Sequence, residues 1–305
     1  MTDFLVTAAA VTGVLILSAC LALLIRAILE PFMLEDVHEI INPPDTLQGD
    51  TPGCSETQCP GSSQPAANGL KTPGFTAVFF TDLHAALCPV SDKKLTGAVF
   101  SSPCDVILFG GDISNHGKGR DKGLQRLSLI ADRAAEHNIP CYAVRGNHDT
   151  SITADDFNRS GFILLENENV PVPSNSGEPF LLLGIDDTGK KARSWPALPT
   201  EYFDDFPVER RIALVHNPDY IFAQKNIRYR YQLSGHFHGG QIYLPFGLEY
   251  VLFRREQLSR EGIRKGIFIK NGVCGYISRG VGCVLIPLRL FSKPQVTHLA
   301  FSERP

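Results

Sequence analysis

Aspartate, asparagine and histidine gather in short polar segments, each of which follows an apolar run. Five such segments lie between residues 82 and 238, and they hold Asp82 with His84, Asp112, Asn147 with His148, His216, and His236 with His238. One histidine at a strand end is usually structural, but five such segments together indicate ligands. Mixed imidazole and carboxylate ligands suit Mn, Fe, Zn or Co better than Ca or Mg. The residue types therefore predict a transition-metal site.

The number of candidate ligands favours two ions. Seven ligands are too many for one ion with open positions, whereas two ions that share a carboxylate can use them all. Two metals about 3.5–4 Å apart can clamp the attacking and leaving oxygens of a phosphoryl displacement and lower the pKa of a bound water. Side chains at i and i+2 of an extended segment point the same way. Asp82 with His84, and His236 with His238, can thus each reach one cavity.

Strands and helices are predicted to alternate around these segments. Apolar runs predict strands at 76–81, 105–109, 141–144, 180–184, 211–215 and 229–233, and helical spacing predicts a helix over 123–138. Shorter pieces at 241–244, 275–278 and 295–301 indicate a second sheet. This pattern predicts a layered α/β domain, in which the carboxyl ends of the strands carry the site.

The N-terminal segment predicts a membrane anchor. Residues 4–25 contain no charged side chain and would span about 33 Å as a helix, enough for the hydrocarbon core. No Lys or Arg precedes them, which argues against a cleaved secretory signal. The residues before Cys20 match a lipoprotein cleavage box, but the apolar run continues past Cys20 and favours an uncleaved anchor. Arg26 after the span favours a cytoplasmic domain.

Composition sets the remaining boundaries. Residues 41–74 are rich in Pro, Gly, Ser, Thr and Gln and predict a flexible linker or insertion, so the catalytic domain is expected over 75–305.

A net charge of −3 gives no case for nucleic-acid binding, and no protein partner is inferred. The eight cysteines form no CxxC pair and are typical of reduced thiols. Cys54 and Cys59 lie in the polar segment and receive no role.

The ordered motifs D-x-H, G-D, G-N-H-D, H and G-H-x-H, which span residues 75–238, resemble the calcineurin-like metallophosphoesterase family. The resemblance implies an α/β/β/α sandwich of two mixed sheets with two divalent ions, Mn²⁺ being expected and Fe, Zn or Co the alternatives. It assigns to one ion Asp82, His84, Asp112 and His238. It assigns to the other Asp112, Asn147, His216 and His236. It further implies that His148 stabilises or protonates the leaving oxygen and that Asp149 orients His148. His116 is expected to be a surface histidine.

The later segments GHFHGGQ and SRGVG resemble a membrane-associated bacterial subgroup of this family that includes diphosphatases of lipid A synthesis. This resemblance implies cleavage of UDP-2,3-diacylglucosamine to UMP and 2,3-diacylglucosamine 1-phosphate, at the inner membrane, by a single-pass protein. An apolar loop at 243–253 would enter the lipid interface, unless it is a core strand. A run of basic side chains would bind the substrate phosphates, unless these side chains form a solvated face. The run consists of Arg254, Arg255, Arg260, Arg264 and Lys265. Arg279 is expected to bind a phosphate or headgroup, with a structural ion pair as the alternative.

Two other functions stay open at this point. The first is a phosphodiesterase or phosphatase that acts on a soluble or cell-envelope substrate. The second is a scaffold that keeps the fold without catalysis, which is disfavoured because every ligand position and His148 are filled.

Overall fold

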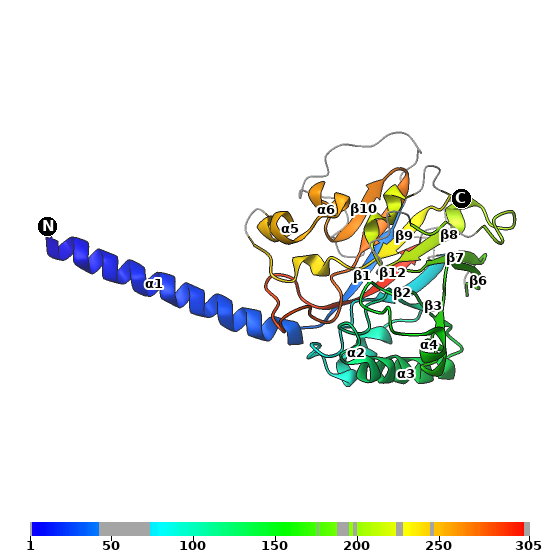
Figure 1. The fold of residues 1–305 in the computed structure, drawn as a ribbon, viewed down its shortest axis with the longest axis horizontal. Coiled ribbons are helices and arrows are strands. Elements are labelled where there is room, and N and C mark those ends of the chain that lie inside the picture. Colours follow the sequence, from blue (N-terminus) through cyan, green and yellow to red (C-terminus); the bar gives the residue numbers. More distant parts are fainter. Residues whose placement is uncertain are drawn as a thin grey trace, which may run out of the picture.

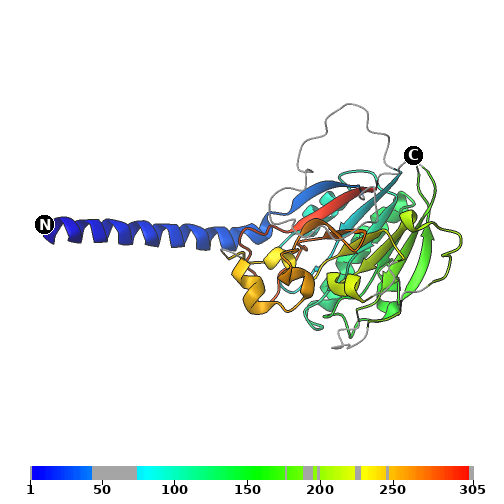
Figure 2. The ribbon, with the colours of Figure 1, turned by 90° about the horizontal axis from the view of Figure 1, so that it is seen from above.

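The computed structural model of the protein describes residues 2–42, 74–175, 177–187, 195–197, 200–223, 228–244 and 247–301. Two six-stranded sheets lie against each other, and a long N-terminal helix projects away from them (Figures 1 and 2). Apart from its first two residues and its last, the predicted linker at 41–74 lies outside the described residues, as do Cys54 and Cys59.

The first sheet has the strand order β1-β12-β2-β3-β4-β5. Its strands are β1 (Glu35–Ile41), β12 (Gln295–Phe301), β2 (Phe75–Phe80), β3 (Val106–Phe109), β4 (Cys141–Ala143) and β5 (Ile163–Leu164). All neighbours are parallel except β12 and β2. The carboxyl ends of β2, β3 and β4 therefore open on one edge, where three of the predicted polar segments follow them.

The second sheet has the order β10-β11-β9-β8-β7-β6. Its strands are β10 (Gly266–Lys270), β11 (Val273–Ile277), β9 (Tyr231–Ser234), β8 (Arg211–Val215), β7 (Phe180–Ile185) and β6 (Glu168–Val172). The four central strands are parallel, and each edge strand is antiparallel to its neighbour. The strand predicted at 241–244 is wrong, because Ile242 makes only an isolated bridge to Leu290.

Three apolar clusters hold the layers together. Between the sheets, side chains such as Phe79, Leu108 and Leu214 form one buried cluster. A second cluster lies under the helices α2 (Asp92–Val99), α3 (Arg120–Glu136) and α4 (Ala154–Arg159). A third packs the outer face of the second sheet against short helices, among them α5 (Leu248–Phe253) and α6 (Gln257–Arg260). Two mixed sheets between helices confirm the predicted α/β/β/α sandwich.

The N-terminal helix α1 (Thr2–Leu29) extends the predicted 4–25 segment by one turn, and a short helical turn, η1 (Glu30–Phe32), follows it. An 18-residue stretch within Phe4–Phe32 has a mean hydropathy of 2.6, so the helix is long and apolar enough to cross a membrane. Its base is attached to the domain, because Arg289 N donates to Ala27 O (3.1 Å) and Ser292 N donates to the buried Glu30 carboxylate.

Strand β1 corrects the predicted domain start at residue 75. It lies before the predicted linker, yet it pairs in parallel with β12 along its whole length. The strand escaped prediction because Glu35, Asp36 and Glu39 interrupt any apolar run. Charged side chains are typical of an edge strand, where they discourage pairing with other chains.

Candidate metal centre

Both sheets deliver side chains to one buried centre. Asp82 and His84 follow β2, and they form a group with His238, which follows β9. Asp112 after β3 forms a second group with His216 and His236, which follow β8 and β9. Within each group the candidate ligand atoms lie within 4.8 Å of one another. The structure thus gathers six of the seven predicted ligands into two adjacent three-residue sets.

The two sets share contacts through their carboxylates. His238 Nε2 lies 3.2 Å from Asp82 Oδ1, and His216 Nε2 lies 3.1 Å from Asp112 Oδ2. His84 Nε2 lies 3.5 Å from Asp112 Oδ2 and 4.0 Å from Asp82 Oδ1, so it faces both carboxylates. Ligand atoms that bind one ion at about 2.0–2.2 Å are separated by roughly 3 Å, which these distances match.

The seventh predicted ligand, Asn147, lies beside Asp112. The backbone N–H of the next residue, His148, donates to Asp112 Oδ1 at 2.8 Å. A Cβ added at the preceding Gly146 would overlap that same carboxylate, so the chain passes directly against it. Asn147 Oδ1 is buried and has no hydrogen-bond partner in the part of the chain that the structure describes.

Backbone strain is concentrated in this centre. Five of the six clustered residues have positive φ angles: Asp82 (52°), His84 (37°), Asp112 (58°), His236 (71°) and His238 (54°). Residues other than glycine rarely adopt this conformation, and it costs on the order of 1–3 kcal/mol each where it occurs. Such strain is characteristic of functional sites, where it aims side chains that a relaxed backbone would direct elsewhere.

Hydrogen bonds fix which nitrogen of each ring faces the centre. His84 Nδ1 lies 3.1 Å from Ser114 O, and His216 Nδ1 lies 2.8 Å from Gly110 O. Since a carbonyl oxygen accepts, each Nδ1 carries a proton and each Nε2 faces the centre. His236 is turned the other way, with Nδ1 3.3 Å from His216 Nε2.

Charge in the centre is balanced within the chain. Burial alone would raise the pKa of Asp82 and of Asp112, but the neighbouring histidines hold both pKa values low. Burial lowers the pKa of His84 to about 3, whereas Asp112 outweighs burial and raises the pKa of His216 to about 10. Both carboxylates are therefore ionised and ready to bind cations.

These residues fit two divalent metal ions. Buried polar atoms nearly always have a hydrogen-bond partner. Within the described chain, His84 Nε2 and Asn147 Oδ1 have none, and both belong to the predicted ligand set. Neutral imidazoles, an amide oxygen and ionised carboxylates are ligands that transition metals accept.

The structure gives the Asp149 carboxylate other hydrogen-bond partners than the predicted one, the His148 ring. The buried carboxylate accepts from the backbone N–H groups of Ile113 (2.9 Å), Ser114 (3.3 Å) and Gly146 (3.1 Å). It therefore ties the segment after β3 to the segment after β4. Burial, with a smaller contribution from Asp112, raises the pKa of Asp149 to about 7.

The His148 ring lies against other rings. Its centroid is 5.0 Å from that of His84 and 3.9 Å from that of His116. Burial lowers the pKa of His148. His116 is exposed, as expected, but its contact with His148 gives it a place beside the centre that its sequence position did not reveal.

Arg279 forms a structural ion pair, which was the alternative to binding a phosphate or headgroup. Its guanidinium pairs with Glu35 of β1 (2.6 Å) and donates to Gln295 of β12, so it joins the second sheet to the edge of the first.

The segment expected as an apolar loop or a core strand at 243–253 contains helix α5 instead. Of the basic run, Arg255, Arg260 and Lys265 are exposed, whereas Arg254 donates to His236 O at 2.7 Å.

Sequence reasoning missed Glu256. Its Oε1 lies 3.0 Å from His236 Nε2, and Asp219 holds the helix that follows it by accepting from Leu258 N at 2.9 Å. The only signal in the sequence was an acid inside a basic run, Arg254-Arg255-Glu256.

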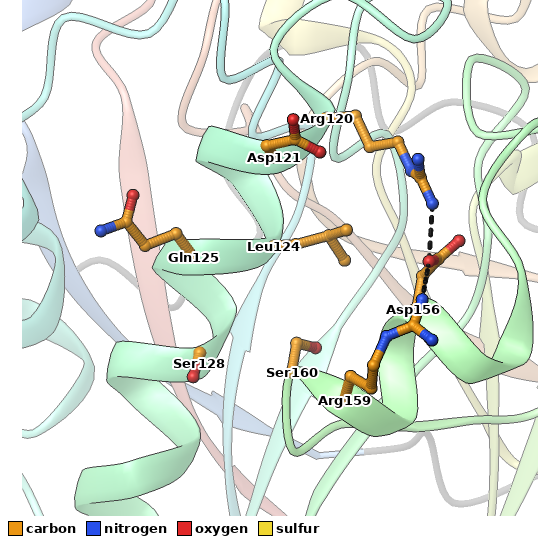
Figure 3. Close-up of a pocket in the computed structure, with 8 residues that line it drawn as sticks. All are labelled: Arg120, Asp121, Leu124, Gln125, Ser128, Asp156, Arg159 and Ser160. Atoms are coloured by element: carbon orange, nitrogen blue, oxygen red, sulfur yellow. Dashed lines mark hydrogen bonds and ion pairs between the residues drawn. The ribbon is translucent and has the colours of Figure 1, made fainter.

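A pocket of about 420 Å³ lies elsewhere, between α3 and α4 (Figure 3). Arg120 and Arg159 both pair there with Asp156, at 2.6 and 2.5 Å. None of its lining residues belongs to the metal centre.

Comparison with known proteins agrees with this geometry. The sequence profile of the calcineurin-like phosphoesterases matches residues 75–240. The uncharacterized metallophosphoesterase YkoQ of Bacillus subtilis is 32% identical, over 71% of this chain and 80% of its own. The phosphodiesterase YaeI of Escherichia coli is 28% identical, over 74% and 81%. Among solved structures, Thermus thermophilus sulfate thiohydrolase SoxB in complex with glycerol has a TM-score of 0.41 and 13% identity, and the match covers 76% of this chain and 58% of that one.

Proposed function

The chain belongs to the calcineurin-like phosphoesterase family and is a metal-dependent phosphoester hydrolase, and from that premise we propose that it acts on a membrane-embedded diphosphate. The proposed substrate is UDP-2,3-diacylglucosamine, and the products are UMP and 2,3-diacylglucosamine 1-phosphate. The protein is proposed to be a single-pass protein of the bacterial inner membrane, with its catalytic domain on the cytoplasmic side, where Arg26 follows the span.

The observation that carries this proposal is the short connection between helix α1 and the metal centre. The buried Glu30, directly after α1, accepts from Ser292 N, and the Ser292 hydroxyl donates to His238 O at 2.7 Å. One residue thus joins the base of the apolar helix to a candidate metal ligand. If α1 crosses a membrane, the centre lies close to the lipid surface, within reach of a headgroup diphosphate.

The proposed ligand sets follow the geometry of the centre. Asp82, His84 and His238 would hold one ion, and Asn147, His216 and His236 would hold the other. Asp112, which His84 and His216 both face, would bind both ions. When bound, the ions supply Lewis acidity and clamp the attacking and leaving oxygens of the displacement.

His148 is proposed to stabilise or protonate the leaving oxygen. Its backbone N–H is fixed by Asp112, and its ring lies at the rim of the centre beside His84. Nδ1 of this ring is buried and has no hydrogen-bond partner among the described residues. Arg254, whose side chain is 23% exposed beside His236, supplies a positive charge for the substrate phosphates.

A phosphodiesterase acting on another substrate is the second candidate. The similarity to YaeI, which is named a phosphodiesterase, favours it. The use of Arg279 in an ion pair with Glu35 also favours it, because that arginine was the expected contact to a lipid headgroup. A scaffold without catalysis is disfavoured because the ligand sets and His148 are complete.

The test is release of UMP from UDP-2,3-diacylglucosamine in detergent micelles by the full chain with Mn²⁺. The D112N variant, which removes the bridging charge, serves as the inactive control. UMP release that depends on Asp112 is expected. Good hydrolysis of bis-p-nitrophenyl phosphate without any release of UMP would reject the lipid substrate and leave the second candidate.

A further inference from the structure

A second cluster of metal-type ligands lies at the outer edge of the first sheet. Asp36 and His38 on β1 and His298 on β12 bring their ligand atoms within 4.8 Å of one another. Asp36 and His38 are two residues apart on one strand and share a face. The register places His38 directly opposite His298 on the neighbouring strand. None of the three residues belongs to the centre described above.

The cluster repeats the geometry of one half of that centre. Asp36 Oδ1 lies 3.0 Å from His298 Nε2 and 3.7 Å from His38 Nε2, and the two rings stack with centroids 4.7 Å apart. The corresponding distances for Asp82, His238 and His84 are 3.2, 4.0 and 5.0 Å. Each set is a D-x-H segment completed by a histidine from a different strand.

The surroundings suit a bound cation with an open coordination position. His298 is buried, whereas Asp36 and His38 are exposed, so an ion would be reached from solvent on one side. His298 Nε2 lies within hydrogen-bond distance of Ala98 O (2.9 Å) and Ser101 Oγ (3.0 Å), so a bound ion would replace the proton that this nitrogen shares with them. Both oxygens belong to the C-terminal end of α2 and the residues after it.

We propose that Asp36, His38 and His298 form a third metal site, separate from the catalytic pair, which takes a Zn²⁺-type transition-metal ion. Two imidazoles and one carboxylate are ligands that such ions bind. The ion links β1, the strand that directly follows helix α1 and its terminal turn, to β12. It thereby fastens the base of the anchor to the catalytic domain.

The experiment counts metal ions. The full chain in detergent is stripped with a chelator, saturated with Zn²⁺, desalted and measured by elemental analysis. H38A and D36N each remove an exposed ligand, and circular dichroism checks their fold. H137A, which removes an exposed histidine outside the cluster, is the matched control. We expect H38A and D36N to bind one Zn²⁺ fewer than the wild type and H137A to bind the same number.

A second measurement separates this site from the catalytic pair. Added Zn²⁺ is expected to raise the unfolding temperature of the wild type and of H137A by more than that of H38A, because an ion that binds only the folded state stabilises it and H38A keeps only the catalytic pair. At the same Zn²⁺ concentration, H38A should hydrolyse bis-p-nitrophenyl phosphate at the wild-type rate. Equal Zn²⁺ content in the wild type, H38A and D36N would show that Asp36 and His298 form only an ion pair, and would overturn the proposal.

Discussion

Glu256 Oε1 lies 3.0 Å from His236 Nε2, and this hydrogen bond turns the opposite ring nitrogen, Nδ1, toward the metal centre. Burial raises the pKa of Glu256, but the hydrogen bond and charge of His236 and the charge of Arg254 together outweigh burial and lower the pKa to about 2. The carboxylate is therefore ionised at neutral pH. A carboxylate that accepts from a ligating histidine fixes its tautomer and ring orientation.

We expect E256A to weaken metal binding by about 10- to 100-fold, the usual cost of removing such a partner. E256Q should recover part of the loss, because its amide oxygen can still accept from His236. The measurement is the Mn²⁺ concentration at half-maximal activity. E261Q, which removes an acid that pairs with Lys270 at 3.4 Å, is the control. Equal behaviour of E256A and E261Q would refute the positioning role.

Removing the metals or a ligand should abolish hydrolysis. A chelator is expected to inactivate the protein, and Mn²⁺ should restore it. H236A should lose more than the approximately 100-fold that the loss of a supporting partner can cost, because it removes the ligand itself. Activity is followed with bis-p-nitrophenyl phosphate. Activity of H236A near the wild-type level would show that the two-metal assignment is wrong.

Replacing His148 by alanine should slow hydrolysis in a way that depends on the leaving group. A residue that donates a proton in the transition state contributes about 10²- to 10⁴-fold. The loss should be large for an alkoxide leaving group and small for p-nitrophenolate, which needs little protonation. The rates of the two substrates are compared for H148A and for H137A. Equal losses with both substrates would exclude proton donation by His148.

Gly235 is required by the close approach of Asp82. A Cβ at this position would overlap Asp82 Oδ2, a candidate metal ligand, and the Thr81 side chain. G235A is expected to lose about 1–3 kcal/mol of stability from overpacking, together with metal affinity. G97A is the control, because its Cβ meets nothing within 4 Å in helix α2 and should add about 0.5–1 kcal/mol. Thermal unfolding and Mn²⁺ titration test both, and wild-type metal affinity in G235A would contradict the crowding argument.

The stability contributed by Asp156 should depend on pH. The hydrogen bond and charge of Arg120 (Figure 3) hold the pKa of Asp156 below its usual range. Thr153 completes a capping box with Asp156. A carboxyl whose pKa falls on folding stabilises the folded state above its unfolded value of about 3.9, and the effect disappears as the pH falls further.

D156N should therefore cost about 1 kcal/mol at pH 7, the usual value of a capping interaction, and progressively less below about pH 4. D155N, in the same helical turn, is the control for helix charge. Thermal unfolding at pH 7 and pH 3 is the measurement. A difference that stays constant with pH would show that the Arg120 pair adds no stability.

Prediction from sequence succeeded where the signal was local. Apolar runs buried on both faces predicted strands such as β2 and β8 within one or two residues, and the polar segments after them meet as expected. Prediction failed where contacts between residues far apart in the chain determine the structure. The acidic residues of β1 mask the strand pattern, and the strand forms through its pairing with β12. The Asp149 carboxylate accepts hydrogen bonds from backbone N–H groups after β3, which its own motif does not indicate. Glu256 contacts His236 from the N-cap of α6, which no sequence motif marks.

The pairing of β1 with β12 has a consequence for biosynthesis. Lys293 and Glu35, which pair at the start of this strand contact, are 258 positions apart in the chain. During translation the apolar helix and β1 are made before β2, while β12, which lies between β1 and β2 in the sheet, is made long afterwards. Contacts so distant in sequence form slowly, since a large loop must close first. The first sheet can therefore close only after most of the chain has been made, and under the proposed membrane insertion of α1 the anchor would be made well before that step.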